Sequence, residues 1–382
     1  MKKVLHGIGG YLKQTDLIFW LISLMATGYG LILIYSLSRA GGSFFKTQIF
    51  AVTLGYIAAI IISIIDYEFI AKLWPLIAGV SVILIFLTYF IGRGVAGTDD
   101  VAWLILPGGL SFQPAELVKI GFIVTFAKHL SYLKDKGKIK TFLGVLTLTG
   151  HAAVPILLVH FQGDDGTALV FVFMFIVMTF AAGVQLRYYL MAFIGVAGAV
   201  PIIWNVMNED QRSRLIALFD LDGNALDKGY QQFQGKISIA SGELTGRGLF
   251  DGPRVTKGIV PYQENDFIFT VAGEELGFIG CVLLLGVLLL LMFRALQNAW
   301  TAKDTLGKYI CFGFFSMIAA QTIINIGMCL GLIPVIGITL PFFSSGGSSV
   351  ACLYLGVGLV ESVYMRRKDN DKVEFHMTPA RI

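Results

Sequence analysis

Charged side chains occur within or beside apolar stretches of this sequence, where they are costly and are therefore candidate functional groups. Glu116 and Lys119 are three residues apart near the start of one stretch, so they share a face if that stretch is helical. Asp266 directly precedes another stretch, and Glu274 and Glu275 follow about two helical turns later. A helix cap would explain Asp266 alone, but it would not explain two carboxylates inside an apolar stretch.

Two pairs of charged residues in the sequence each allow two interpretations. Glu116 and Lys119 form either a neutralising pair that holds helices together or part of a polar site. Asp164 and Asp165 stand between Gly163 and Gly166 in a short turn, where an aspartate can cap the next helix. Two in succession could equally hold a cation or a partner lysine.

The composition decides the class of protein that must position these groups. Of 382 residues, 56% are hydrophobic and 14% are charged, against roughly 25% charged in an average soluble domain. This excludes an ordinary cytosolic enzyme, a disordered chain and a secreted disulfide scaffold. No basic tract with interleaved aromatics indicates nucleic-acid binding, and the four cysteines lie in apolar runs without paired spacing. We therefore expect an all-α polytopic membrane protein.

The apolar stretches predict about ten transmembrane helices, since a spanning helix needs about 20 predominantly apolar residues. The expected spans are 17–36, 47–65, 74–91, 114–132, 141–160, 167–184, 188–206, 267–293, 308–331 and 346–365. Lys and Arg of the short connections gather on the side of the N-terminus, which predicts that both termini are cytoplasmic. The whole of 1–382 then forms one membrane domain with a cytoplasmic tail at 366–382.

The segment 206–266 is the one long connection between two spans, and it falls on the extracytoplasmic side. It lacks strong helical periodicity, and its many glycines and mixed charges predict an irregular loop. A loop of this length between spans needs a functional reason. Part of it, 233–249, alternates apolar and small residues as a segment dipping into the membrane interface would.

Ordered motifs along nearly the whole chain resemble those of a known family. They are QPAEL at 113–117, QGDDGTA at 162–168, GYQQFQGKI at 229–237, GRG at 246–248, DFIF at 266–269, GEELG at 273–277, PVIG at 334–337 and PFFSSGGSS at 341–349. By these motifs the sequence resembles the SEDS proteins (shape, elongation, division and sporulation), which include RodA, FtsW and SpoVE. The short tails look most like the RodA branch.

The resemblance implies a peptidoglycan glycosyltransferase of the bacterial inner membrane. Such enzymes polymerise lipid II, a disaccharide-pentapeptide on undecaprenyl diphosphate, at the outer face beside a class B penicillin-binding protein. The family's catalytic aspartate corresponds to Asp266. The residues expected to bind substrate or support the site are Glu116, Lys119, Asp164, Asp165, Gln234, Lys236, Arg247, Glu274, Glu275, Ser344 and Ser345. No cofactor is certain, although Mg²⁺ or Mn²⁺ could share the charge of the diphosphate.

The sequence departs from the family pattern at a few positions. Ala102 replaces an arginine, Gly163 a proline, Asp165 a leucine, Asn265 a threonine and Ser345 a tyrosine. None of these changes removes the key carboxylate.

The residues alone admit other functions. One is a flippase for the lipid-linked precursor, since Glu116 and Lys119 would suit a polar pathway. A scaffold that recruits the penicillin-binding protein, or a division or sporulation paralogue, are further alternatives. We expect Asp266 to act as a base, with its proton affinity raised by burial and by Glu274 and Glu275.

Overall fold

The structure is a computed structural model that describes residues 10–39, 44–94, 101–105, 111–219 and 229–367. It is an all-α bundle with one two-stranded antiparallel sheet of minimal length. Its helices are α2 (Leu17–Arg39), α3 (Phe44–Ile64), α4 (Tyr67–Lys72), α5 (Trp74–Ile91), α6 (Pro114–Asp135), α7 (Phe142–His160), α8 (Asp165–Ala182), α9 (Leu186–Val206), α10 (Glu209–Phe219), α11 (Tyr230–Ser241), α12 (Pro253–Thr256), α13 (Ile268–Thr301), α14 (Thr305–Cys329) and α15 (Gly347–Met365), and the strands are β1 (Leu104–Ile105) and β2 (Ser111–Phe112).

The expected fold class is confirmed. Nine of the helices in the described part of the chain are long and apolar enough to cross a membrane. The expected span that is not among these nine is 114–132, which corresponds to α6; this helix is 22 residues long but carries Glu116, Lys119 and further charged residues. The count of ten spans therefore stays a prediction. Most of the expected tail lies outside the described residues, which end at 367.

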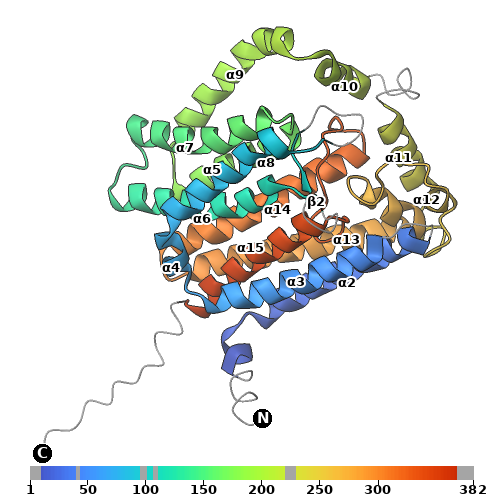
Figure 1. The fold of residues 1–382 in the computed structure, drawn as a ribbon, viewed down its shortest axis with the longest axis horizontal. Helices are drawn as coiled ribbons and strands as arrows, with labels where there is room; N and C mark the ends of the chain where they lie inside the picture. Colours follow the sequence, from blue (N-terminus) through green and yellow to red (C-terminus); the bar gives the residue numbers. More distant parts are fainter. Residues whose placement is uncertain (1–9, 40–43, 95–100, 106–110, 220–228, 368–382) are drawn as a thin grey trace, which may run out of the picture.

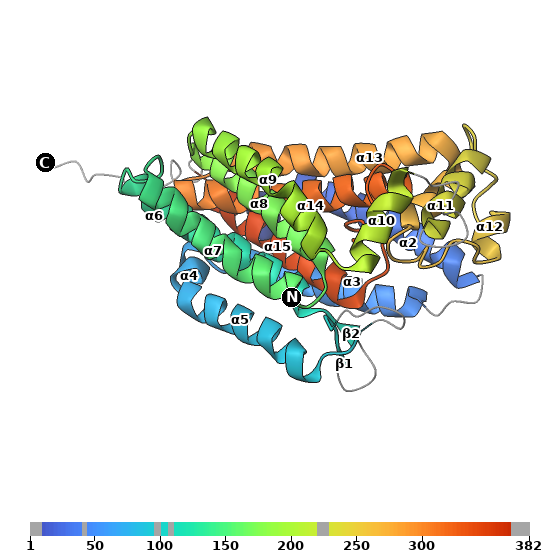
Figure 2. The same cartoon turned by 90° about the horizontal axis from the view of Figure 1, so that it is seen from above.

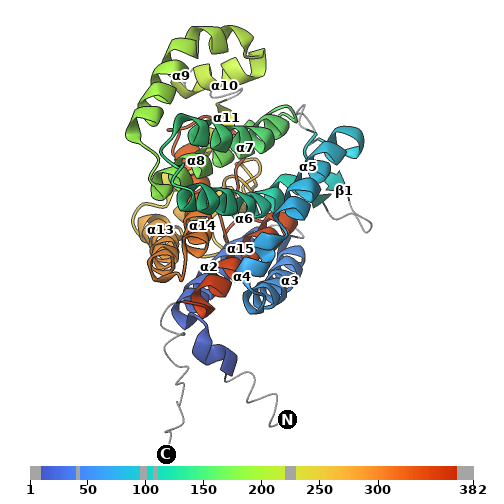
Figure 3. The same ribbon diagram turned by 90° about the vertical axis from the view of Figure 1, so that its left-hand side faces the viewer.

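Burial separates the inner helices of the bundle from the outer ones. Helices α14 and α15 run through the middle, and Figure 3 shows them surrounded by the others. Helix α5 lies at one side of the bundle in Figure 2 and buries only two side chains. Helix α9 buries none, and with α10 it forms an arm that arches away from the other helices in Figure 1. Apolar side chains on such outer faces meet lipid instead of a protein core.

The prediction of an irregular loop at 206–266 is wrong for much of that segment. It contains α10, α11 and the short α12. Helix α11 packs against the start of α13, where Gly242 lies so close that a Cβ would stand 1.9 Å from the carbonyl oxygen of Gly273. This packing supplies the stability that the sequence periodicity did not signal.

Helix α13 is broken at Gly277, whose φ of 64° and ψ of −160° are open to glycine but not to other residues. The turn at 243–248 satisfies the backbone groups that the break leaves without helical partners. The Arg247 N–H donates to the Glu274 carbonyl at 2.9 Å, and the Phe278 N–H donates to the Glu243 carbonyl at 2.9 Å. A broken helix is tolerated in a membrane where protein re-satisfies its backbone in this way.

A buried ion pair joins α13 to the start of α2. The carboxylate of Asp16, which is 1% exposed, accepts hydrogen bonds from Arg294 Nε at 2.7 Å and Nη2 at 2.9 Å. Asn298 Nδ2 donates to the same carboxylate at 3.0 Å. The Asp16 N–H in turn donates to Glu361 of α15 at 3.0 Å, so the cluster ties three helices together.

We expect Arg294→Met to lower the thermal unfolding midpoint of the purified protein strongly. The change leaves a buried carboxylate without its cation, which costs about 3–5 kcal/mol. Scanning fluorimetry in detergent measures the effect. Lys303→Met, which removes an exposed cation shortly after α13, is the matched control. Equal midpoints for the two variants would contradict a stabilising role for the pair.

Candidate active site

A cavity of about 1590 Å³ opens where several helices begin or end. Helices α6, α8 and α13 begin beside it, α7 and α9 end beside it, and the α14–α15 connection completes the wall. The site residues that line it are Glu116, Asp164, Asp165, Asp266 and Ser345. The structure thus brings together residues up to 229 positions apart in the sequence, from Glu116 to Ser345.

Asp266 is held at the cavity wall through its backbone. Asn325 Nδ2 of α14 donates to the Asp266 carbonyl at 2.8 Å and to the Ile338 carbonyl at 2.7 Å. Ser344 Oγ donates to the Asn265 carbonyl at 2.5 Å, and the Ser345 N–H donates to the Glu264 carbonyl at 2.7 Å. These bonds fix the residues around Asp266 while leaving its carboxylate to the cavity. Ser344 and Ser345 were expected either to bind substrate or to support the site, and these hydrogen bonds make them supports.

Burial, together with the charges of Asp164 and Glu264, raises the pKa of the Asp266 carboxyl to about 7. A carboxyl with a pKa near the working pH is suited to exchange protons. The rise agrees with expectation, but the acidic neighbours that contribute are Asp164 and Glu264 and not Glu274 and Glu275.

Asp164 combines a cap with a second contact. Its Oδ1 accepts from the Thr167 N–H at 2.9 Å and so caps α8, while its Oδ2 accepts from Gln113 Nε2 at 2.6 Å. Burial raises the pKa of Asp164 to about 6, against the opposing effects of the hydrogen bonds from Thr167 and of the charge of Lys119. Asp164 is therefore the cap of α8, as one of its two interpretations required.

Glu116 and Lys119 form an ion pair at 2.9 Å between Oε2 and Nζ. Lys119 is 1% exposed and does not line the cavity, whereas Glu116 does. Both interpretations of the pair from the sequence therefore apply. The two charges neutralise each other within the bundle, and the Glu116 carboxylate borders the cavity.

The Asp165 carboxylate contacts two neighbouring side chains. Its Oδ1 lies 2.5 Å from His160 Nδ1, and its Oδ2 accepts from Gln211 Nε2 at 2.6 Å. Because Gln211 belongs to α10, Asp165 connects the arm of α9 and α10 to the start of α8.

Besides Lys119 and Ser344, five further predicted site residues do not line the cavity. Lys236 and Arg247 are exposed side chains, on α11 and in the following turn. Gln234 Oε1 accepts from Arg254 Nη2, which fastens α12 to α11. Glu274 and Glu275 are fully buried, and their contacts are with the Arg254 N–H at 2.7 Å and Ser36 Oγ at 2.5 Å. Sequence motifs placed these residues near Asp266, but the break in α13 and the path of α11 direct them elsewhere.

The sequence analysis missed or misjudged three residues that shape the site. Arg214 of α10 lines the cavity and is the one Lys or Arg among the described lining residues. No signal pointed to it, because its segment lacked a recognised helical pattern. Gln113 stood in the QPAEL motif directly before Glu116. Asn325 was not among the expected site residues, and its side chain donates to the carbonyls of Asp266 and Ile338.

The family model described as the FtsW, RodA and SpoVE cell cycle protein matches residues 16–369. The chain belongs to this family. It is the SEDS family inferred above from the motifs, and its members compared below are peptidoglycan glycosyltransferases by name or relatives of them. The chain is accordingly an enzyme of that class.

Curated SEDS relatives align over nearly their whole length. The chain is similar to stage V sporulation protein E of Bacillus subtilis, with 34% identity over 91% of this chain and 96% of the relative. It is 32% identical to the probable peptidoglycan glycosyltransferase FtsW of Geobacter sulfurreducens, over 94% and 97%. It is 31% identical to the peptidoglycan glycosyltransferase MrdB of Escherichia coli, over 91% and 93%.

Solved structures share the fold. A chain of a peptidoglycan synthase complex that coordinates polymerization and crosslinking superposes with a TM-score of 0.80 at 27% identity, over 94% of this chain and 99% of that chain. The rod shape determining protein RodA of Thermus thermophilus gives 0.69 at 26% identity, over 93% and 98%.

We expect Asp266→Asn to raise the thermal midpoint of this SEDS protein at about pH 8.5 by a few degrees, and by less near pH 5. A carboxyl whose folded pKa is raised costs stability as pH rises from its ordinary value to about 7, and the full cost persists above that. Asp135→Asn, at an exposed carboxyl, is the control. A gain that does not change with pH would contradict the raised pKa.

Proposed function

We propose that this chain polymerises lipid II into glycan strands at the outer face of the cytoplasmic membrane, with Asp266 as the general base. The proposal rests on the position and acidity of the Asp266 carboxyl. It lines the cavity just before a membrane helix begins, and its pKa is about 7. Relatives named as peptidoglycan glycosyltransferases support the reaction class.

The proposed reaction needs one proton acceptor and positive charge near a diphosphate. The ionised Asp266 takes the proton of the acceptor sugar hydroxyl, and that oxygen bonds to the anomeric carbon of the donor. The bond from this carbon to the diphosphate oxygen breaks, and the diphosphate leaves with the electron pair. Proton transfer of this kind contributes about 10²–10⁴-fold to a rate.

Both kinds of surface that a lipid-linked sugar requires occur on the cavity wall. The apolar side chains Ile202, Ile203 and Val206 of α9 face it on one side, and Arg214 stands on the neighbouring α10. The guanidinium is suited to bidentate contact with phosphate oxygens. We infer that the polyprenyl chain enters along α9 and that the diphosphate binds beside Arg214.

A divalent cation remains part of the proposal. Mg²⁺ is commonly held by one or two carboxylates together with substrate phosphates. The described residues contain no group of three or more His, Cys, Asp and Glu side chains placed to hold a metal by themselves. Asp164, on the same cavity wall, would offer a carboxylate, and the diphosphate would supply other ligands, which leaves Asp266 free to act as the base.

The proposed setting is the bacterial inner membrane with both termini in the cytoplasm. A class B penicillin-binding protein is the proposed partner, which the similarity to a synthase complex supports. We propose cell elongation as the process served. Identities of 34%, 32% and 31% to the sporulation protein, FtsW and MrdB do not separate the branches, so division or sporulation is the alternative. Depletion in the native cell tests this, because rounding indicates elongation and filamentation indicates division.

The flippase alternative is less well supported by the charges of the described residues. The carboxylates of Asp164, Asp165 and Asp266 gather at one end of the bundle, around a single cavity. A transport pathway for a charged headgroup needs polar groups toward both faces.

We expect Asp266→Asn to lower lipid II polymerisation by at least about 10²-fold, because the amide cannot accept the hydroxyl proton. In the parent protein the rate should rise with pH and level off above about 7, where Asp266 is ionised. Gel analysis of strands made from labelled lipid II, by the protein together with its partner, measures both. Asp135→Asn is the control. Parent-level polymerisation by a folded Asp266→Asn variant would refute the assignment.

We expect Arg214→Gln to weaken polymerisation by about tenfold, chiefly by raising the KM for lipid II, since a charged contact to phosphate is lost. Lys236→Gln, which removes an exposed cation on α11 outside the cavity wall, should have a much smaller effect. Equal losses in the two variants would remove the reason for placing the diphosphate beside α10.

A further inference from the structure

A second, much smaller cavity adjoins the first beside Glu116. It measures about 10 Å³, which is room for about one water molecule. Glu116, Thr339 and Ser349 line both cavities, so we call the smaller one the side chamber. Its other walls come from α6, α14, α15 and the connection before α15. Most of the residues in these walls are apolar, and Gln321 of α14 is one of the polar exceptions.

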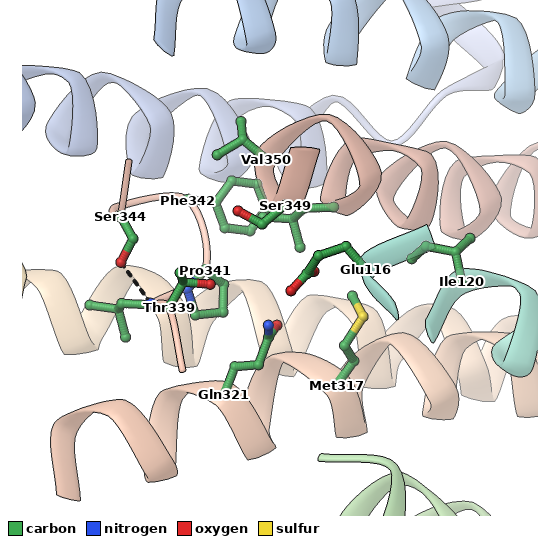
Figure 4. A pocket seen from close by; sticks show the side chains of 12 residues that line it. Glu116, Ile120, Met317, Gln321, Thr339, Pro341, Phe342, Ser344, Ser349 and Val350 are labelled. Carbon is green, nitrogen blue, oxygen red and sulfur yellow. Dashed lines mark hydrogen bonds between the residues drawn. The ribbon is translucent and has the colours of Figure 1, made fainter. Parts of the chain in front are cut away.

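Gln321 is the unexplained polar side chain of this chamber. It is 4% exposed, and its amide has no hydrogen-bond partner among residues 10–39, 44–94, 101–105, 111–219 and 229–367. Figure 4 shows the Gln321 amide and the Glu116 carboxylate pointing into the same space. A buried amide left without partners is unfavourable by about 1–3 kcal/mol, so native structures rarely contain one.

The neighbouring polar groups have separate tasks. Asn325, one turn further along α14, donates to the carbonyls of Asp266 and Ile338. Ser349 Oγ donates to the Gly346 carbonyl at 3.2 Å and can still accept. Glu116 Oε2 is paired with Lys119 at 2.9 Å, and its carboxylate has further acceptor sites. The chamber therefore offers an amide, a hydroxyl and a carboxylate to one small polar molecule.

We propose that one ordered water molecule binds in the side chamber and joins Gln321 to Glu116. The Gln321 amide donates to the water, and the water donates to the carboxylate. Lys119 already supplies the positive charge beside Glu116, so a neutral occupant fits better than a cation. A buried water typically makes about three such bonds.

This assigns Gln321 a positioning role. Through the water it holds the Glu116 carboxylate at the edge of the reaction cavity, and with it the orientation of the ion pair to Lys119. The consequence for catalysis rests on the proposed function, whereas the water itself does not.

The first test is structural. A cryo-EM or crystal map of the whole protein in complex with its partner, at a resolution that shows other buried waters, should contain density between Gln321 and Glu116. The same density should be absent in Gln321→Met, which keeps the length and approximate volume of the side chain without its polar atoms. A parent map that shows other buried waters but none in the chamber would overturn the proposal.

The second test is kinetic. Gln321→Met should lower lipid II polymerisation by about tenfold. Gln321→Asn, which keeps the amide and leaves room for a second water, should recover most of this loss. The matched control is Thr322→Val, which removes the buried hydroxyl of the next residue on α14 without changing the chamber wall. It should retain parent activity.

The outcomes separate this inference from the proposed function. Equal losses in Gln321→Met and Thr322→Val, or no recovery in Gln321→Asn, would refute the positioning role. Asp266→Asn is assayed in parallel. If that variant polymerises at the parent rate, the proposed base is wrong, while the water density still decides whether the chamber is a binding site.

Discussion

The site depends on the pair of hydrogen bonds that Asn325 donates to the carbonyls of Asp266 and Ile338. Asp266 lies in non-helical backbone just before α13. Ile338 lies in the non-helical connection between α14 and α15. Backbone carbonyls at membrane depth need partners from the protein, because lipid offers none. One amide on the central helix α14 supplies both, and it thereby holds the Asp266 segment and the adjacent Ile338 segment in a fixed relation.

The same constraint explains why α13 and the segment before it belong together. The break at Gly277 turns the first part of α13 away from the axis of the long span, and the turn at 243–248 closes over the freed backbone groups. Glu274 and Glu275 are then buried behind the site, where they bind α12 and α2. Their place in the sequence made them candidates for the cavity, but their place in the structure makes them supports for the polypeptide that carries Asp266.

The sequence allowed some parts of this arrangement to be predicted and concealed others, for physical reasons. Spanning helices are visible because a bilayer demands about 20 apolar residues whatever the tertiary contacts. Asp266 was assigned through the DFIF motif of the resembled family, because a carboxylate at the edge of such a helix could by itself be only a cap. Helix α11 was missed because its packing against α13, and not periodicity, stabilises it, and the segment of α10 showed no recognised helical pattern. Lys236 was misplaced for a related reason: a motif gives the order of residues along a helix but not which face meets a cavity, and this depends on the glycine contacts of α11 with α13.

The positions at which the sequence departs from the resembled family all line the large cavity: they are Ala102, Gly163, Asp165, Asn265 and Ser345. By that resemblance, Ala102, Gly163 and Ser345 stand where the family has bulkier residues. Gly163 adopts a φ of 87°, which proline cannot reach, so the turn before Asp164 has its own geometry. Asp165 brings compensating partners in His160 and Gln211. The wall has therefore changed in shape and polarity, while the bonds that hold Asp266 come from residues outside this set or from the backbone.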